Sequence, residues 1–398
     1  MRKGKLYISI LLGLCLCLFT AFFTACGKEE KKNNKIVIEE PKGWYTEGEV
    51  NITEEQVDYV LSKEFTTPKN IIVIIGDGMG PTDITLAEKH VDGVFDFGLI
   101  LNKIKNHGLA TTQSASDAVT DSAASGTALS TGIKTNNGYI GKDVYGNDLI
   151  TMAELARSVG KKVGIITDEV ISGATPTAFT VHNISRSNTA ELINSMIKFK
   201  PDALMGEDYN SVRMVLDDEA RTIFETEMIV AKDFKRFKDA LDLDKDCKVP
   251  FLGFNDGYSS VASYNLANCA EVALKRLKND KGFFLMIESS GTDKYGHGND
   301  IKGKLNSVVT LDRTVAAVLK FMANNPDTLL VITSDHETGG VKLEDENTKY
   351  LSDLITVTEH TATPVRVFGV GKGTEYFNGK TVDNTDIAKF LIKAIRGE

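Results

Sequence analysis

The chain has 398 residues, of which 42% are hydrophobic and 25% charged, and its formal net charge at pH 7 is −9. This acidic balance argues against nucleic acid as a partner, because binding to a phosphate backbone requires clustered positive charge. An acidic protein that binds an anion must reverse its field locally, and clustered metal cations do this.

Residues 1–25 predict an export signal of the lipoprotein type. Arg2, Lys3 and Lys5 supply a positive start, and residues 6–25 are an uncharged apolar run. Because small residues precede Cys26, we expect cleavage there and a lipid on Cys26, with an uncleaved anchor or plain secretion as alternatives. The protein is then exported and membrane-anchored, in the periplasm or at the cell surface. Residues 26–68 predict a charged tether and N-terminal segment, and residues 69–398 one large domain.

Cysteine usage agrees with export. Of the five cysteines, only Cys247 and Cys269 fall in the predicted domain, where they either pair or stand as separate buried thiols. No Cys-x-x-Cys occurs, so metal ligands, if present, are expected to be carboxylates and histidines.

Apolar, β-rich runs alternate with segments of helical spacing. The predicted strands are 71–75, 163–167, 283–288, 329–333 and 365–370, and the predicted helices are 151–159, 189–199, 261–277, 305–321 and 385–395. This order indicates an α/β fold, a mostly parallel central sheet with helices on both faces. Residues 212–250 are charged and suggest a peripheral excursion, and residues 371–380 a hairpin or turn.

Polar side chains follow most of these strands, and the carboxyl ends of parallel strands meet at one sheet edge. Asp77 ends a glycine-rich turn after the first strand, in a spacing that does not match a dinucleotide loop. Thr175 follows the second strand, Glu288 closes the third, and Asp335 with His336 follows the fourth. A carboxylate at such a place suits a divalent cation.

Three further segments contain candidate catalytic or metal-binding side chains. Thr120-Asp-Ser-Ala-Ala predicts a helix start at which Ser122 meets free backbone N–H groups, although a plain capped helix has the same pattern. Asp293 and His297 are four residues apart, so one helical turn would set them side by side as ligands. His360 precedes the last strand. His90, His107 and His182 do not fall beside the carboxylates named above and are interpreted as ordinary.

Taken together, these motifs resemble the alkaline phosphatase family, from Ile-Gly-Asp-Gly-Met-Gly at 75–80 to Glu-His-Thr at 359–361. The resemblance implies that residues 69–398 are a catalytic domain that hydrolyses phosphate monoesters through a phosphoserine on Ser122, with Arg186 as phosphate clamp. It implies two Zn²⁺ and one Mg²⁺, and it allows a homodimer. The implied ligands are Asp293, His297 and His360 for one zinc, Asp77, Ser122, Asp335 and His336 for the other, and Asp77, Thr175 and Glu288 for magnesium.

Two positions qualify the resemblance. Gly173 stands where family members often carry an acidic or imidazole side chain, so a contact around the magnesium is expected to be missing. Lys294 matches members that carry lysine there, and is expected to reach bound phosphate through water.

Two other functions remain open at this point. A phosphodiesterase, or a hydrolase of sulfate esters or phosphonates, would use the same metal architecture, but the fork of Arg186 suits the extra unesterified oxygen of a monoester. A phosphate- or metal-binding lipoprotein without turnover would not need Ser122.

Overall fold

The structure, a computed structural model, describes residues 50–90, 95–207, 209–231, 249–254, 266–345 and 348–398. The predicted export signal, Cys26 as the predicted lipid attachment point, and Cys247 lie outside these ranges. Among the described helices, none combines the length and the apolar character needed to cross a membrane.

A ten-stranded sheet forms the centre, in the order β12-β2-β11-β8-β1-β7-β3-β4-β6-β5. β11 runs antiparallel to both of its neighbours, and the other pairs are parallel. The strands are β1 (Asn70–Gly76), β2 (Asn106–Thr111), β3 (Lys162–Val170), β4 (Ala203–Glu207), β5 (Met228–Ala231), β6 (Val249–Phe254), β7 (Phe283–Ser289), β8 (Thr328–Thr333), β11 (Val365–Val370) and β12 (Thr381–Asp383). A separate two-stranded ribbon pairs β9 (Glu337–Thr338) with β10 (His360–Thr361).

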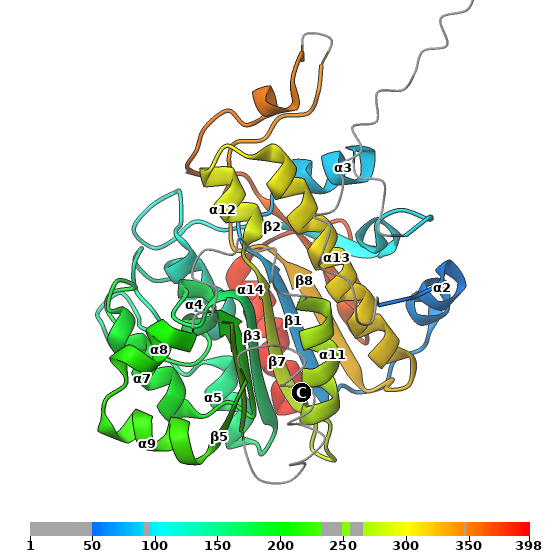
Figure 1. The fold of residues 1–398 in the computed structure, drawn as a ribbon. Coiled ribbons are helices and arrows are strands. Elements are labelled where there is room, and N and C mark those ends of the chain that lie inside the picture. The colour runs from blue at the N-terminus through cyan, green and yellow to red at the C-terminus, as the bar shows by residue number, and fades with distance from the viewer. Residues whose placement is uncertain (1–49, 91–94, 208, 232–248, 255–265, 346–347) are drawn as a thin grey trace, which may run out of the picture. The chain divides into compact units, whose positions relative to one another are not determined.

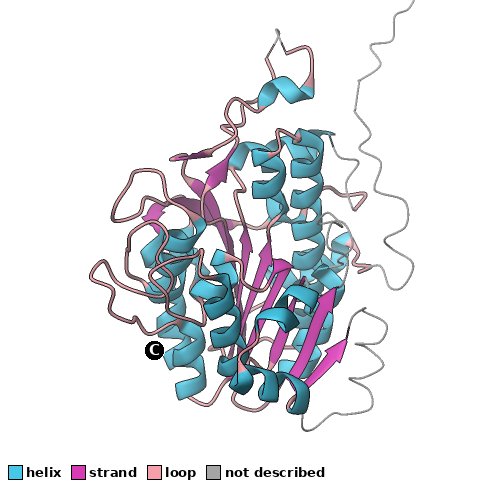
Figure 2. Cartoon of the chain, turned by 60° about the vertical axis from the view of Figure 1, so that its left-hand side comes forward, coloured by secondary structure: helices cyan, strands magenta, loops and turns pink. Residues whose placement is uncertain are grey.

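Helices cover both faces of the sheet (Figures 1 and 2). The helices are α2 (Glu54–Ser62), α3 (Pro81–His90), α4 (Ser122–Thr131), α5 (Met152–Ser158), α6 (Ala174–Ala178), α7 (Thr189–Phe199), α8 (Tyr209–Val215), α9 (Asp218–Thr226), α11 (Leu266–Leu277), α12 (Gly291–His297), α13 (Ile301–Ala323) and α14 (Asn384–Arg396). Figure 1 shows α11 and α13 in front of the sheet and α14 behind it. Short 3-10 turns, η1 (Ile100–Lys103), η3 (Leu351–Leu354) and η4 (Thr374–Phe377), complete the described elements.

The α/β fold with a mostly parallel sheet and helices on both faces is confirmed. All five predicted strands are present within three residues of their predicted ends, and 189–199 matches α7 at both ends. The predicted helix 305–321 is longer, at Ile301–Ala323, and 261–277 is described only from Leu266. Within 212–250 the structure places α9, β5 and the start of β6 at one edge of the sheet, and 371–380 contains η4.

The central strand β1 shows why the sheet is buried on both sides. All of its residues are buried, and Ile71, Val73 and Ile75 belong to the large core cluster that α14 closes with Leu391 and Ile395. Alternate side chains point to opposite faces of a strand, so Ile72 and Ile74 face the layer of α11 and α13. An uninterrupted Ile/Val run is therefore what this position requires.

Candidate metal centre

The register of three neighbouring strands brings the first carboxylates together. β1 pairs with β7 and β8 in parallel, with Ile75 opposite Glu288 on one side and opposite Thr333 on the other. Asp77 and Asp335 each lie two residues beyond these paired positions. Because the chains leave the sheet in the same direction, their polar ends meet at one edge.

Asp77, Asp335 and His336 form the first group. His336 Nε2 lies 3.4 Å from Asp77 Oδ1 and 3.3 Å from Asp335 Oδ2. All three residues are buried, and neither of these carboxylate oxygens has a hydrogen-bond partner. Asp335 is oriented through its other oxygen, which accepts hydrogen bonds from Gly78 N and from His336 N. A buried polar atom without a partner calls for an explanation, and a cation at the point where three such groups converge supplies it.

Asp293, His297 and His360 form the second group. Asp293 Oδ1 lies 3.3 Å from both His297 Nε2 and His360 Nε2, and the two Nε2 atoms are 3.1 Å apart. The sequence left open whether Asp293 and His297 share a helical turn or a loop, and the structure places both on α12. Their spacing of four residues therefore puts them on one face.

The two groups touch each other. The rings of His336 and His360 stack with centroids 3.6 Å apart. Asp293, His336 and His360 also offer ligand atoms that all lie within 4.8 Å of one another, as do Asp77, Asp335 and His336. Two cations held by these groups would be close neighbours.

Hydrogen bonds at the opposite ring nitrogen fix the tautomer of each histidine. His360 Nδ1 faces the Thr120 carbonyl at 3.0 Å, and His297 Nδ1 faces the Thr358 carbonyl, so both Nδ1 atoms must donate. His336 Nδ1 lies 3.2 Å from Thr338 Oγ1. That hydroxyl gives its proton to Asp293 Oδ1 at 2.6 Å, so it accepts from His336. All three Nε2 atoms then carry the lone pair that metal binding requires.

Ser122 is the first residue of α4 and is buried beside the first group. Its Oγ lies 3.2 Å from His336 Nε2. The preceding residue Asp121 caps the helix by accepting from Ala124 N, and Gly132 ends it with a left-handed φ of 76°. The remaining free N–H groups and the helix dipole make this end favourable for an anion.

Arg186 approaches the same helix end from the segment before α7. Its guanidinium contacts Asp121 Oδ2 at 3.2 Å, and its side chain is 40% exposed. Asp121 therefore caps α4 through one hydrogen bond and binds one guanidinium nitrogen of Arg186 through another. The other guanidinium nitrogens stay available for a bidentate contact with an anion near Ser122.

Thr175 and Glu288 lie at the neighbouring strand end. β3 pairs with β7 so that Thr167 stands opposite Glu288, and the Thr167 hydroxyl donates to Glu288 Oε2. Glu288 Oε1 and Thr175 Oγ1 are buried and have no hydrogen-bond partner. Two further oxygen donors are thus free to receive a cation.

Glu169 and Lys294 were not grouped by the sequence. Their side chains form an ion pair of 3.3 Å, and Glu169 lies against Gly173. Of the two, the sequence singled out only Lys294. The consecutive acids Asp168 and Glu169 at the end of β3 were the available signal.

The pKa values of this cluster show an excess of buried negative charge. Burial, followed by repulsion from Asp335 and Asp293, raises the pKa of Asp77 well above its ordinary value. Burial and the charge of Glu169 do the same for the pKa of Glu288. Each shift means that the protein alone penalises the ionised carboxylate, and bound cations remove that penalty.

The donor set fits metal ions. Carboxylate oxygens and imidazole nitrogens with no thiolate suit Zn²⁺ in the two histidine-containing groups. Oxygens alone, from Asp77, Thr175 and Glu288, suit the harder Mg²⁺.

The histidines expected to be ordinary lie apart from these groups. His107 is in β2, His90 pairs with Glu344, and His182 pairs with Glu154.

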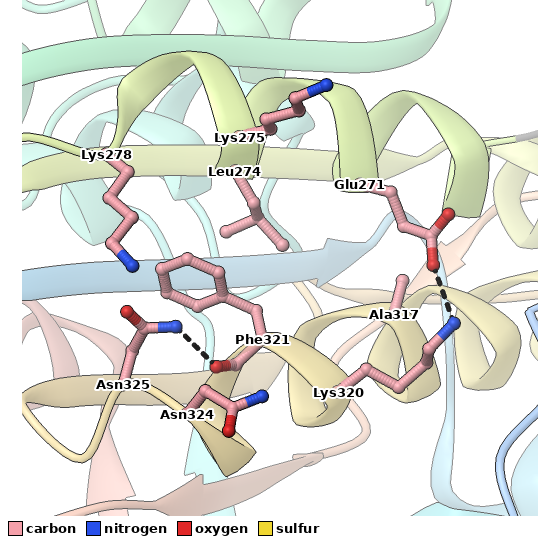
Figure 3. A pocket seen from close by; sticks show the side chains of 9 residues that line it. All are labelled: Glu271, Leu274, Lys275, Lys278, Ala317, Lys320, Phe321, Asn324 and Asn325. Atoms are coloured by element: carbon pink, nitrogen blue, oxygen red, sulfur yellow. Dashed lines mark hydrogen bonds and ion pairs between the residues drawn. The ribbon is translucent and has the colours of Figure 1, made fainter.

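A second concave region lies elsewhere, between α11 and α13. Figure 3 shows its lining, which includes Leu274, Phe321 and the ion pair of Lys320 with Glu271. None of the predicted site residues contributes to it. Its volume is about 420 Å³, but its walls offer lysine and amide ends in place of converging acids and histidines.

An α/β fold whose strand ends gather carboxylates, histidines and a serine at the start of a helix defines a metal-dependent hydrolase of the phosphatase type. Comparison with known proteins narrows this class. The family model described as alkaline phosphatase matches residues 68–215 and 241–355, more than half of the chain. The chain belongs to the alkaline phosphatase family.

Several relatives share this similarity. The chain is 31% identical over 328 residues to the alkaline phosphatase of Escherichia coli K12, covering 67% of this chain and 70% of that protein. It is 32% identical over 291 residues to alkaline phosphatase 4 of Bacillus subtilis, covering 68% of this chain and 62% of the relative. The matched region thus leaves about a third of each curated relative's length uncovered.

Among solved structures, the alkaline phosphatase of the Antarctic bacterium TAB5 has a TM-score of 0.72 and 26% identity, covering 84% of this chain and 99% of that one. A variant of the TAB5 enzyme with magnesium bound in its M3 site has a TM-score of 0.73 and 27% identity, with the same coverage.

Proposed function

We propose that this chain hydrolyses phosphate monoesters through a phosphoserine on Ser122. The observation that carries the proposal is the position of the Ser122 hydroxyl, 3.2 Å from His336 Nε2 at the meeting point of two candidate metal groups. A serine hydroxyl is a weak nucleophile until a base or a cation lowers its pKa. Here it lies beside the Asp77, Asp335 and His336 group, where a bound cation would lower its pKa.

Three cations are proposed for the centre. Two Zn²⁺ would stabilise the entering and leaving oxygens of an in-line displacement, and one Mg²⁺ would balance the remaining charge. Asp77 would be shared between the second zinc and the magnesium, because its two oxygens can serve two ions. The proposed ligands are Asp293, His297 and His360 for the first zinc, Asp77, Ser122, Asp335 and His336 for the second, and Asp77, Thr175 and Glu288 for the magnesium.

Ser122, Arg186, Lys294 and the start of α4 each have a separate role in this reaction. The Ser122 oxygen gives up its proton to solvent and forms a bond to phosphorus while the ester oxygen leaves with the electron pair of the broken P–O bond. Water then forms a bond to phosphorus, the bond between phosphorus and the Ser122 oxygen breaks, and phosphate is released as Ser122 regains a proton. The fork of Arg186 holds two non-bridging oxygens, and the N–H groups at the start of α4 face the third. Lys294 reaches the bound phosphate through water, from its place beside Glu169.

A phosphodiesterase, or a hydrolase of sulfate esters or phosphonates, is the second candidate within this architecture. Arg186 and the start of α4 together favour the monoester, because they offer donors to three unesterified oxygens and a diester has only two. Comparing turnover of p-nitrophenyl phosphate with that of bis(p-nitrophenyl) phosphate separates the two. A diester rate above the monoester rate would make the second candidate the better one.

The decisive experiment is phosphate release from a panel of monoesters, with metal analysis of the same preparation. Ser122→Ala should abolish the phosphoserine and lower kcat by at least about a hundredfold. Ser130→Ala is the matched control, because Ser130 is also a buried serine of α4 and its hydroxyl makes no hydrogen bond. A kcat in Ser122→Ala within about tenfold of the parent value would exclude the mechanism.

Export and lipidation at Cys26 are proposed as well. A Cys26→Ser variant should no longer take up labelled fatty acid and should leave the membrane fraction. Unchanged labelling would exclude Cys26 as the attachment point.

A further inference from the structure

The space at Gly173 is already filled by another side chain. A Cβ placed on Gly173 would lie 1.7 Å from Glu169 Oε1 and 2.6 Å from Glu169 Cδ. Gly173 has φ −50° and ψ 150°, a backbone conformation open to any residue, so glycine is not needed there for its torsion angles. The absence of a side chain at 173 is therefore what makes room for the carboxylate of Glu169.

Glu169 is held in this place by its own strand. The register of β3 against β4 shifts between Ile166 and Val170, and Glu169 N donates to Thr167 Oγ1 at 3.1 Å. The same Thr167 hydroxyl donates to Glu288 Oε2. Glu169 and Glu288 are thus anchored to one residue. On its outer side Glu169 contacts Lys294, and its side chain is only 16% exposed.

The neighbouring donors lack a partner. Thr175 Oγ1 and Glu288 Oε1 belong to residues that are at most 1% exposed, and neither atom makes a hydrogen bond. The charge of Glu169 contributes to the raised pKa of Glu288 and of Asp77, so its carboxylate lies within electrostatic reach of both. One lysine cannot neutralise three carboxylates, and a cation among them would.

We propose that Glu169 completes the cation site of Asp77, Thr175 and Glu288, supplying from strand β3 the carboxylate that position 173 lacks. The inference rests on the proposed function, because it concerns the magnesium of that centre. Under this proposal, Glu169 supplies the contact around the magnesium that Gly173 is expected to leave missing. Mg²⁺ prefers oxygen donors, and this arrangement provides them from three carboxylates and a hydroxyl.

An exchange of the two side chains tests the proposal. Glu169→Ala removes the carboxylate, and the double variant Glu169→Ala/Gly173→Asp returns one from the other side of the same space. Mg²⁺ is titrated calorimetrically into zinc-loaded protein in the absence of any ester. We expect Glu169→Ala to weaken Mg²⁺ binding by about tenfold to a hundredfold and the double variant to recover most of the loss.

Glu169→Gln keeps the size of the side chain and should weaken Mg²⁺ binding in the same direction, which covers the case in which the alanine variant does not fold. Glu271→Ala, which removes a paired carboxylate from the surface of α11, is the control and should bind Mg²⁺ as the parent does. Parent-like affinity in Glu169→Gln, or no recovery in the double variant, would overturn the proposal. Because this titration does not involve hydrolysis, its result is separate from that of Ser122→Ala.

Discussion

The Thr338 hydroxyl donates a hydrogen bond of 2.6 Å to Asp293 Oδ1. Thr338 Oγ1 in turn accepts a hydrogen bond from His336 Nδ1, so one small side chain on β9 orients a ligand of each candidate zinc. It has a single proton to give, and this fixes the direction of both hydrogen bonds.

Replacing Thr338 should therefore loosen both zinc sites. Thr338→Val keeps the shape and removes the hydroxyl, and we expect zinc affinity to fall by about tenfold to a hundredfold. Thr338→Ser retains the hydroxyl and is the matched control. Competition with a chromogenic chelator measures the affinity, and equal values for the valine and serine variants would contradict the assigned role.

His360→Ala should remove the first zinc and spare the second. His360 contributes to the group with Asp293 and His297, whereas the Asp77, Asp335 and His336 group stays complete. Metal analysis should show a loss of about one zinc per chain, because three protein ligands are the usual minimum for a catalytic site. His182→Ala, which disrupts the pair with Glu154 away from the centre, should keep the parent's zinc content. Full zinc content in His360→Ala would count against this ligand set.

Lys294→Ala should change the inhibition constant of inorganic phosphate more than the rate of the chemical step. Burial acts against it, but the charges of Glu169 and Asp168 raise the pKa of Lys294, so it stays protonated at alkaline pH. A cation beside the bound anion mainly stabilises the ground state, so its loss should weaken phosphate binding. Phosphate inhibition and single-turnover rates are compared for the variant and for Lys320→Ala. Equal inhibition in all proteins would refute the prediction.

Lys304→Met should be strongly destabilising. Lys304 Nζ contacts Asp83 Oδ2 at 2.6 Å and donates to Gly78 O at 2.9 Å, and both side chains are fully buried. Removing one partner leaves the other as an uncompensated buried charge, at a cost of about 3–5 kcal/mol. Lys320→Met breaks an exposed pair with Glu271 and should cost less than about 1 kcal/mol. Urea unfolding of the two variants should separate them, and similar midpoints would contradict the expectation.

Asp312 should make stability depend on pH between about 4 and 7. Burial raises its pKa to about 7, against hydrogen bonds from Ile100 N and Leu101 N that lower it. The folded chain then binds this proton more tightly than the unfolded chain. The stabilisation is fully present below the unfolded pKa and is lost as pH rises through the folded pKa, by roughly 1.4 kcal/mol per unit.

Asp312→Asn cannot titrate, so the melting temperature of the parent relative to this variant should fall from pH 5 to pH 8. Both proteins are measured after chelator treatment, so that metal loss at low pH does not enter the comparison. A difference in melting temperature that stays constant with pH would contradict the assigned pKa.

Much of the fold could be predicted from the sequence, because the local composition of these segments favours the same elements that the folded sheet requires. The Ile/Val run of β1 is buried on both faces, so composition alone marked it as a central strand. β4, with the sequence Ala-Leu-Met-Gly-Glu, and β2, with Asn-His-Gly-Leu-Ala-Thr, are short or polar and are held as strands by their neighbours. Such pairing is decided by tertiary contacts, which a sequence window does not contain.

Some residues of the candidate centre could be predicted from the sequence, and others could not. Asp77, Asp335 and His336 stand in fixed motifs at strand ends, so their convergence followed from the parallel sheet. Glu169 could not be placed in this way, because its proposed role depends on the missing side chain at Gly173 and on a register shift in β3. The sequence did not indicate the role of Thr338 either, because a hydroxyl that orients two ligands has no characteristic spacing in a sequence.

The pairing of β9 with β10 determines which residues between Thr338 and His360 can be replaced without moving His360. His360 pairs with Thr338, so the segment between them leaves the centre and returns to a fixed point. Its length is not what positions His360, because both of its ends are tied by backbone hydrogen bonds. Residues between these two anchors but short of Thr358, whose carbonyl holds His297 Nδ1, can be lengthened, shortened or exchanged for a different loop, and the His360 imidazole will still lie beside Asp293 and His297.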